Sequence, residues 1–194
     1  VVQEIQAELK ALTEVAADAQ SASSTLNVYQ KKRVNIFIDH AKDNASAAVG
    51  NGTEYLVQVS EKNSGNDTWR TVGSVEAQIT APTAVVTDAQ EAAGQTVIEI
   101  GAVTPVVGDI LFWKNATLAN SEWSKVVAIS AGVSFTAQDG ITNVQAAGTY
   151  YTQGEHFIIT VNVRGFTRLR VVANNAKGTT NRAIVWRCAA ITEA

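Results

Sequence analysis

The sequence predicts a mainly β protein: an antiparallel β-sandwich of the jelly-roll or immunoglobulin-like kind, with an inserted small β-barrel or meander module and a short N-terminal helix. Three observations lead to this prediction. Apolar and polar residues alternate in several segments, as they do in half-buried strands. Turn signals built on Asn and Gly separate these segments, and the N-terminal stretch has helical spacing instead.

The N-terminal segment, residues 1–26, is expected to form a helix followed by a short linker. Ile5, Leu9 and Leu12 recur at spacings of four and three, which places them on one side of a helix. A stripe this short is marginal as an isolated helix, so it must pack on the β domain, on other copies of the chain or on a partner. The three residues are predicted interaction residues. Deleting residues 1–22 is expected to weaken attachment or oligomerisation more than it weakens folding of the β domains.

The sandwich is predicted from residues 27–81 and 154–194. In the first part, Val34, Ile36 and Ile38 fall on one face of a strand. In the second part, the last strand, "RAIVWRCAAI", alternates in the same way and is expected to be buried. Strands from both ends of the chain would then cover the two inner faces of a two-layer sandwich.

Residues 82–153 have a different character and predict the inserted module. This segment contains both prolines of the chain, Pro82 and Pro105. Its strands are short and are joined by turns that contain glycine, as in a small barrel or meander. They are "QTVIEIGA", "GDILFWK", "EWSKVVAIS" and "GVSFTAQ". Proteins tolerate insertions of this kind at exposed connections between strands.

The residue types that carry catalysis are scarce in this chain. It has two histidines and one cysteine, whereas a zinc site needs three or four ligands. Asp39 and His40 are neighbours in a predicted strand, so their side chains should point to opposite faces. Cys188 lies in an apolar strand and is expected to be buried and inert. We therefore expect no enzyme activity, no catalytic residue, no cofactor and no metal ion. A carboxylate pair formed by the fold and a calcium loop at 62–67 stay open as alternatives.

The charge of the chain bears on its partners. The formal net charge is −3, and charged residues make up 17% of the chain, below the roughly 25% of ordinary soluble domains. Such a chain is not expected to bind DNA through its phosphates, and no apolar run is long enough to span a membrane. Low charge suits either a surface that other proteins cover or a β-sandwich with a neutral surface.

Two tryptophans are candidates for binding. Trp113 and Trp123 flank the polar stretch "KNATLANSE" in the inserted module. Exposed indoles could stack on sugar rings, whereas buried indoles would anchor the core. The alternating strands around them favour the core, and both residues are kept as possible interaction residues.

The inserted module resembles a small β unit that is common in bacteriophage virion proteins. The resemblance is carried by "TVIEIGAVTPVVGDILFW", "SEWSKVVAIS", "GVSFTAQDGI" and "QAAGT". The flanking stretches look like phage head and tail accessory proteins, namely "EYLVQVSEKNSGNDTWRTVG" and "RLRVVANNAKGTTNRAIVW". The resemblance covers residues 27–191 and leaves out the N-terminal helix. Its motifs are structural, so it brings no active-site residue.

The resemblance implies a non-enzymatic structural protein of the virion, most of all a capsid decoration (cement) protein that stabilises contacts between capsomers. It implies the major capsid protein as partner and a homo-oligomer, with a trimer favoured. The location would be the capsid exterior, after assembly in the host cytoplasm, with neither nucleic acid nor membrane as partner. A tail, neck or fibre component and a carbohydrate-binding β module are the alternatives.

Overall fold

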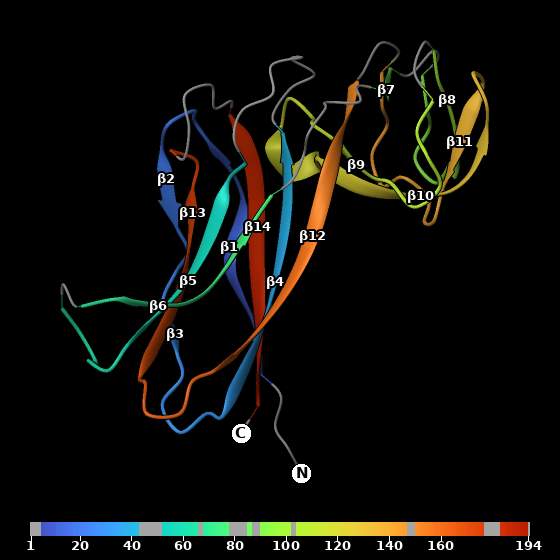
Figure 1. Ribbon diagram of the computed structural model, residues 1–194. Coiled ribbons are helices and arrows are strands. Elements are labelled where there is room, and N and C mark those ends of the chain that lie inside the picture. Colours follow the sequence, from blue (N-terminus) through green and yellow to red (C-terminus); the bar gives the residue numbers. More distant parts are fainter. Residues whose placement is uncertain are drawn as a thin grey trace. The chain divides into compact units, whose positions relative to one another are not determined.

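The computed structural model describes residues 5–42, 52–65, 68–77, 85–86, 90–101, 104–146, 150–176 and 183–193. The chain divides into two compact units (Figure 1). Unit 1 comprises Val1–His40, Gly50–Gln78 and His156–Ala194, and unit 2 comprises Ala41–Val49 and Ile79–Glu155. Antiparallel strand pairs build both units, so the predicted mainly β class is confirmed. Among the described residues, no helix is long and apolar enough to cross a membrane.

Unit 1 contains two β-sheets (Figure 1). In the first sheet the order within the unit is β1–β14–β4–β12. The bounds are β1 Ile5–Val15, β14 Ile184–Glu193, β4 Arg33–Lys42 and β12 Tyr150–Asn162. In the second sheet the order is β2–β13–β5–β6, with β3 also beside β13. The bounds are β2 Gln20–Ala22, β3 Leu26–Asn27, β5 Glu54–Ser60, β6 Arg70–Glu76 and β13 Arg168–Asn174. The end of β4 and the start of β12 belong to unit 2.

Apolar side chains from both sheets form the core of unit 1. Val34, Ile36 and Ile38 of β4 are completely buried, as their alternation predicts. Trp186 and Cys188 of β14 are buried in the same core, which confirms the predicted buried strand. Each fully buried valine or isoleucine side chain contributes roughly 1.5–3 kcal/mol of hydrophobic stabilisation.

Asp39 and His40 point to opposite faces of β4, as the sequence predicts. His40 is buried, and a hydrogen bond of 2.7 Å joins its Nδ1 to the hydroxyl of Tyr55. The ring centroids of His40 and Tyr55 lie 5.7 Å apart in an edge-to-face arrangement. The side chain of His40 therefore lies in the core, and that of the adjacent Asp39 lies on the opposite, more exposed face of the strand.

The predicted N-terminal helix is wrong, because Ile5–Val15 form strand β1, which pairs antiparallel with β14. Two register shifts interrupt this pairing, one between Glu8 and Lys10 and the other between Lys10 and Thr13. An irregularity of this kind adds a residue to one strand and changes which face the following side chains take. The apolar residues of β1 consequently do not recur at every second position, as in a regular strand, and their spacing imitates that of a helix.

Unit 2 contains the short strands that the sequence predicts. Their order is β12–β9–β10–β11–β8, with β7 also beside β12. The bounds are β7 Val85–Val86, β8 Val97–Glu99, β9 Ile110–Trp113, β10 Glu122–Ser130 and β11 Ser134–Ala137, with a 3₁₀ helix at Leu118–Asn120. A separate core includes Ile98, Leu111 and Phe135. That residues 82–153 fold as an inserted domain of their own stays a prediction, and 82–84 lie outside the described residues.

A buried polar network ties strands and loops of unit 2 together. The Tyr151 hydroxyl donates to Gln145 Oε1, and Gln145 Nε2 donates to Glu122 Oε1 at 3.0 Å. The backbones of Gln145 and Glu91 exchange two hydrogen bonds of 2.9 and 3.0 Å. Burial raises the pKa of Tyr151 more than its bond to Gln145 lowers it, and the charges of Glu122 and Glu91 raise it further. The phenol therefore stays protonated and keeps its role as donor.

Candidate interaction surfaces

Unit 2 exposes large apolar side chains that we call the valine patch: Val106, Val107, Val127, Ile129 and Val133. Each of them is between 42% and 65% exposed. Large contiguous apolar patches are uncommon at the surface of soluble monomers and often mark places where another surface binds. The valine patch is therefore the first candidate interaction surface.

Backbone hydrogen bonds bring the segments of the valine patch together. Gly108 N donates to Val126 O at 2.8 Å, and Val126 N donates to Asp109 O at 2.9 Å. These bonds place the turn before β9 beside β10. Gly132 N donates to Thr104 Oγ1 at 3.0 Å, which ties the turn after β10 to the same segment. Residues from three stretches of chain thus contribute to one region.

The turn that carries Val106 and Val107 is fixed by its own residues. Asp109 N donates to Val106 O at 3.0 Å, and Val106 N donates to Asp109 Oδ2 at 2.8 Å. Gly108 has a φ of 100°, in the left-handed region where a side chain would be strained. The fold therefore holds both valines at the corner of a hydrogen-bonded turn, and their exposure follows from that geometry.

Unit 1 carries a second candidate surface on the sheet β2–β13–β5–β6. The guanidinium carbon of Arg170 lies 4.3 Å from the centroid of the Trp69 ring, and that of Arg168 lies 5.2 Å from it. Contacts of this kind stabilise by roughly 0.5–1 kcal/mol each at exposed sites. We call Trp69, Arg168 and Arg170, all of them half-buried, the arginine–tryptophan cluster.

The two arginines share a face because they are two residues apart in β13. Arg170 Nε donates to Gln58 Oε1 at 2.9 Å across the β13–β5 pair, and Arg168 Nε donates to Lys62 O at 2.7 Å. Burial lowers the pKa of Arg170, and the neighbouring charge of Arg168 lowers it further. Two positive charges are thus held side by side, and both stay charged because arginine does not lose its proton in proteins.

A hollow of about 510 Å³ opens beside Arg168. Its lining consists of Thr25, Asn27, Tyr29, Glu61, Asn63, Thr167 and Arg168. Tyr29 stands exposed at a turn in which its N–H donates to Asn27 Oδ1 at 2.9 Å. Thr167 Oγ1 donates to Lys62 O at 2.7 Å and so holds the loop that carries Glu61 and Asn63. The hollow combines an aromatic ring, amides, hydroxyls and charges, a set suited to a polar ligand.

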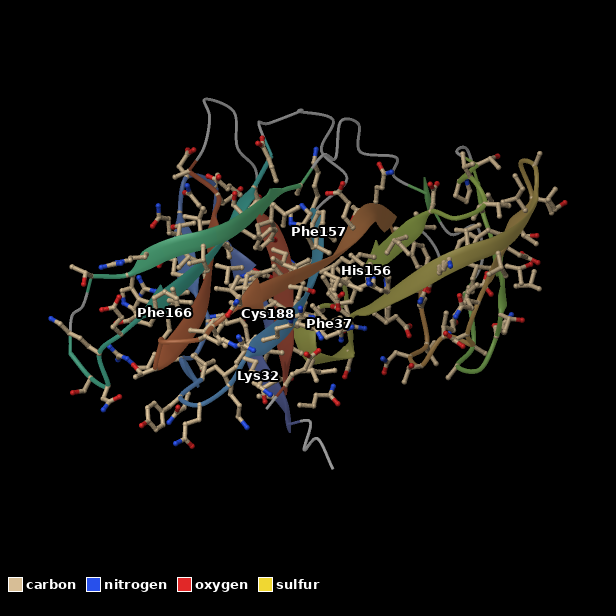
Figure 2. All side chains as sticks on the ribbon, turned by 60° about the horizontal axis from the view of Figure 1, so that its bottom comes forward. Lys32, Phe37, His156, Phe157, Phe166 and Cys188 are labelled. Carbon is tan, nitrogen blue, oxygen red and sulfur yellow. The ribbon has the colours of Figure 1, made fainter. Side chains whose placement is uncertain are left out.

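A charged cluster lies on the other sheet of unit 1. Asp39 Oδ1 is 3.0 Å from His156 Nδ1, and Asp39 Oδ2 is 2.5 Å from Arg187 Nε. Figure 2 labels one residue of each strand involved: Phe37 of β4, His156 of β12 and Cys188 of β14. Burial acts to raise the pKa of Asp39, but the hydrogen bonds from His156 and Arg187 prevail, and the pKa is lowered. Both carboxylate oxygens are engaged, which suits a structural ion pair better than a general base.

The predicted N-terminal interaction residues do not form an exposed stripe. Leu9 is buried in the core of unit 1, and Leu12 is half-buried. The side chain of Ile5 lies outside the described part of the chain, although its backbone belongs to β1. The helix as a binding element is therefore corrected to a strand of the sandwich, with Leu9 serving the core.

The two predicted tryptophans lie in unit 2 as parts of its packing. Trp113 is 3% exposed and belongs to the core, so it offers no platform for a sugar ring. Trp123 is half-buried, and its ring centroid lies 4.5 Å from that of Phe112. A role of Trp123 in binding stays a prediction.

Within the described residues, no group of three or more His, Cys, Asp or Glu side chains could hold a metal ion.

The sequence patterns did not point to the valine patch or to the full arginine–tryptophan cluster. The signal for the first is the pair Val106–Val107 directly before a Gly-Asp turn, where polar residues are usual. The signal for the second is the spacing of Arg168 and Arg170, which puts both on one face of a strand. Their approach to Trp69 has no signal of its own, because it depends on how β13, β5 and β6 pair.

No protein-family model matches this sequence, and no curated protein matches it. Among solved structures, the chain is similar to the SPBc2 prophage-derived protein YomS. The sequence identity is 7%, the TM-score is 0.32, and the match covers 100% of this chain and 96% of that one. A similarity at this level carries no conclusion about the function of this chain.

Proposed function

We propose that the protein is a non-enzymatic structural protein of a phage virion, and that its leading role is capsid decoration. In this role it binds the major capsid protein where capsomers meet and stabilises their contacts. The work requires surface area and shape complementarity, and it requires no chemical step.

The observation that carries the proposal is the valine patch. Its side chains are exposed on hydrogen-bonded turns and on strand β10, so each copy of the chain presents the same apolar surface. The core of a protein–protein interface is apolar and poor in charge. A chain with 17% charged residues and an apolar patch of this kind suits a protein that works while covered by others.

The resemblance of residues 27–191 to phage head and tail accessory proteins supports the same proposal. A decoration protein gains from symmetry, because many weak contacts act together on one particle. A homotrimer at the capsid exterior is the favoured assembly, since three copies would present three valine patches to surrounding capsomers. A tail, neck or fibre component would use the same surfaces but in far fewer copies per particle.

Copy number tests the proposal. Quantitative mass spectrometry of purified particles gives the ratio of this chain to the major coat subunit. We expect a ratio near one to one, or a simple fraction set by the symmetry of the capsid. A handful of copies would assign the protein to the tail or neck, and its absence from particles would refute a virion role.

A further inference from the structure

We propose that the arginine–tryptophan cluster and the hollow beside it bind an acidic segment of a protein partner, with a carboxylate held by Arg170. This inference rests on the proposed function in one respect, namely that the occupant is a segment of protein. It concerns a surface of unit 1, whereas the valine patch belongs to unit 2.

The charge of this surface selects an acidic occupant. The segment next to the cluster carries two basic residues, Lys62 and Arg70, and two acidic ones, Glu61 and Asp67. The excess of positive charge therefore comes from Arg168 and Arg170. The carboxylate of Glu61 is engaged by Arg70, with Nη1 and Oε1 3.5 Å apart. The chain as a whole has a net charge of −3, so this surface has the opposite sign of charge to the chain. Interfaces pair surfaces of opposite potential, which here means a partner rich in Asp or Glu.

The hydrogen-bonding capacity of Arg170 points to a carboxylate in particular. Its Nε donates to Gln58, and within the described residues its two Nη groups meet no acceptor. A guanidinium has five N–H donors in a planar fork that matches the two oxygens of a carboxylate. Trp69 stacks on the guanidinium, an arrangement that leaves the donors at its edge available. Because Arg170 is half-buried, a carboxylate bound there would be partly shielded from water, and the pair would be stronger than at an open surface.

The surface is also organised before any partner arrives. Arg168 is fixed by Trp69 on one side and by the carbonyl of Lys62 on the other. Tyr29 is 62% exposed at the lining of the hollow. Trp, Tyr and Arg are the residue types that dominate binding energy at protein interfaces. The hollow, about 510 Å³, has room for side chains of the incoming segment.

Fluorescence anisotropy of a labelled peptide that alternates glutamate and glycine tests the ligand class on the full chain. We expect the glutamate peptide to bind, its glutamine counterpart not to bind, and the affinity to fall as salt is raised from low to physiological concentration. Hyaluronate, an acidic polysaccharide, is the competing probe. Binding of hyaluronate without binding of the glutamate peptide, or equal binding of both peptides, would overturn the proposal.

Three matched substitutions locate the site. Arg170→Gln should weaken binding of the glutamate peptide roughly tenfold or more, because it removes one partner of a shielded charge pair. Glu61→Gln should strengthen it about two- to threefold by removing a competing exposed carboxylate. Arg187→Gln makes the same charge change on the other sheet and should leave the affinity unchanged. If Arg170→Gln disturbs folding, the gain expected from Glu61→Gln still tests the site, and an unchanged affinity in that variant would overturn it.

The proposed function and this inference fail separately. A chain that is absent from particles but binds the glutamate peptide through Arg170 loses the virion role and keeps the acidic-segment site. A chain that decorates particles but binds neither probe keeps its role and loses this site.

Discussion

Val15 at the end of β1 is the pairing partner of Ile184 at the start of β14, and both side chains are buried in the core of unit 1. Deleting residues 1–22 removes this contact, together with strands β1 and β2 and the buried Leu9. Loss of one large core side chain costs about 2–5 kcal/mol. We therefore expect the deletion to unfold unit 1 or to lower its free energy of unfolding by several kcal/mol, measured by urea denaturation.

Loss of a peripheral helix would weaken attachment and spare folding, whereas loss of β1 and β2 should weaken folding itself. Leu12→Ala is the milder comparison, because Leu12 is half-buried and its truncation should cost less than Leu9→Ala. A truncated chain with an unchanged urea midpoint would contradict the place of β1 in the sandwich.

The double variant Val107→Asp with Val133→Asp should lower the occupancy of particles at least tenfold while leaving the chain folded. Both residues are exposed, so the new charges cost less than about 0.5 kcal/mol in the free protein. In an interface they would be buried without partners, which is costly. Particle pull-down with quantification of the bound chain gives the occupancy, and thermal unfolding gives the folding control. Ile158→Asp places one such charge on an exposed apolar residue of unit 1, and this variant should bind normally.

Asp39→Asn should lower the stability of unit 1 by roughly 1 kcal/mol or less at neutral pH, because the ion pairs it breaks are partly exposed. The pKa of Asp39 is lowered in the folded chain, so its contribution is present above the unfolded-state value near 3.8 and is lost as pH falls below it. The difference between wild type and variant should therefore shrink below about pH 4. Urea midpoints measured across pH give this curve, and Asp139→Asn, at an exposed site in unit 2, is the matched control.

Cys188 should resist thiol reagents in the folded protein. Burial raises the pKa of this thiol to about 12, against the charge of Lys10, which lowers it. The thiolate that reacts is therefore scarce at pH 8, and the sulfur is also shielded from the reagent. A colorimetric disulfide reagent should label the chain in guanidinium and leave it unlabelled in buffer. Stoichiometric labelling of the native protein within minutes would show that β14 is not packed as described.

Tyr151→Phe should destabilise unit 2 by about 1–3 kcal/mol. The change removes the donor to Gln145 Oε1 and leaves that oxygen buried without its partner. Urea denaturation followed by tryptophan fluorescence would report the loss, since Trp113 and Trp123 both lie in unit 2. Tyr29→Phe makes the same chemical change at an exposed residue and should have little effect.

Local patterns predicted those parts of the fold whose strands alternate without interruption. The side chains of Val34, Ile36 and Ile38 keep one phase along β4, and the same holds for Trp186 and Cys188 along β14. In β1 the phase is broken by register shifts that arise only when the strand pairs with β14. These shifts give the apolar residues of β1 a helix-like spacing, and nothing in the local sequence reveals the distant strand that accounts for it, which is why the sequence favoured a helix there.

The candidate surfaces were harder to predict for a related reason. Burial of Trp113 was foreseeable from its alternating strand, whereas the closeness of Trp69 to Arg170 depends on the pairing of three strands. The valine patch could have been noticed at Val106 and Val107, but its extension to Val133 depends on the hydrogen bond between Gly132 and Thr104. Surfaces assembled across strands are a product of the tertiary fold.

The pairing of β1 with β14 also has a consequence for biogenesis. The ribosome makes β1 well before β14, so this edge of the sandwich must wait for a closure that spans most of the sequence, and such distant contacts form slowly. Strands β9, β10 and β11 pair with near neighbours in unit 2 and can come together while later segments are still being translated. We expect unit 2 to mature first during synthesis. Until β14 emerges, the apolar residues of β1 would be accessible to chaperones.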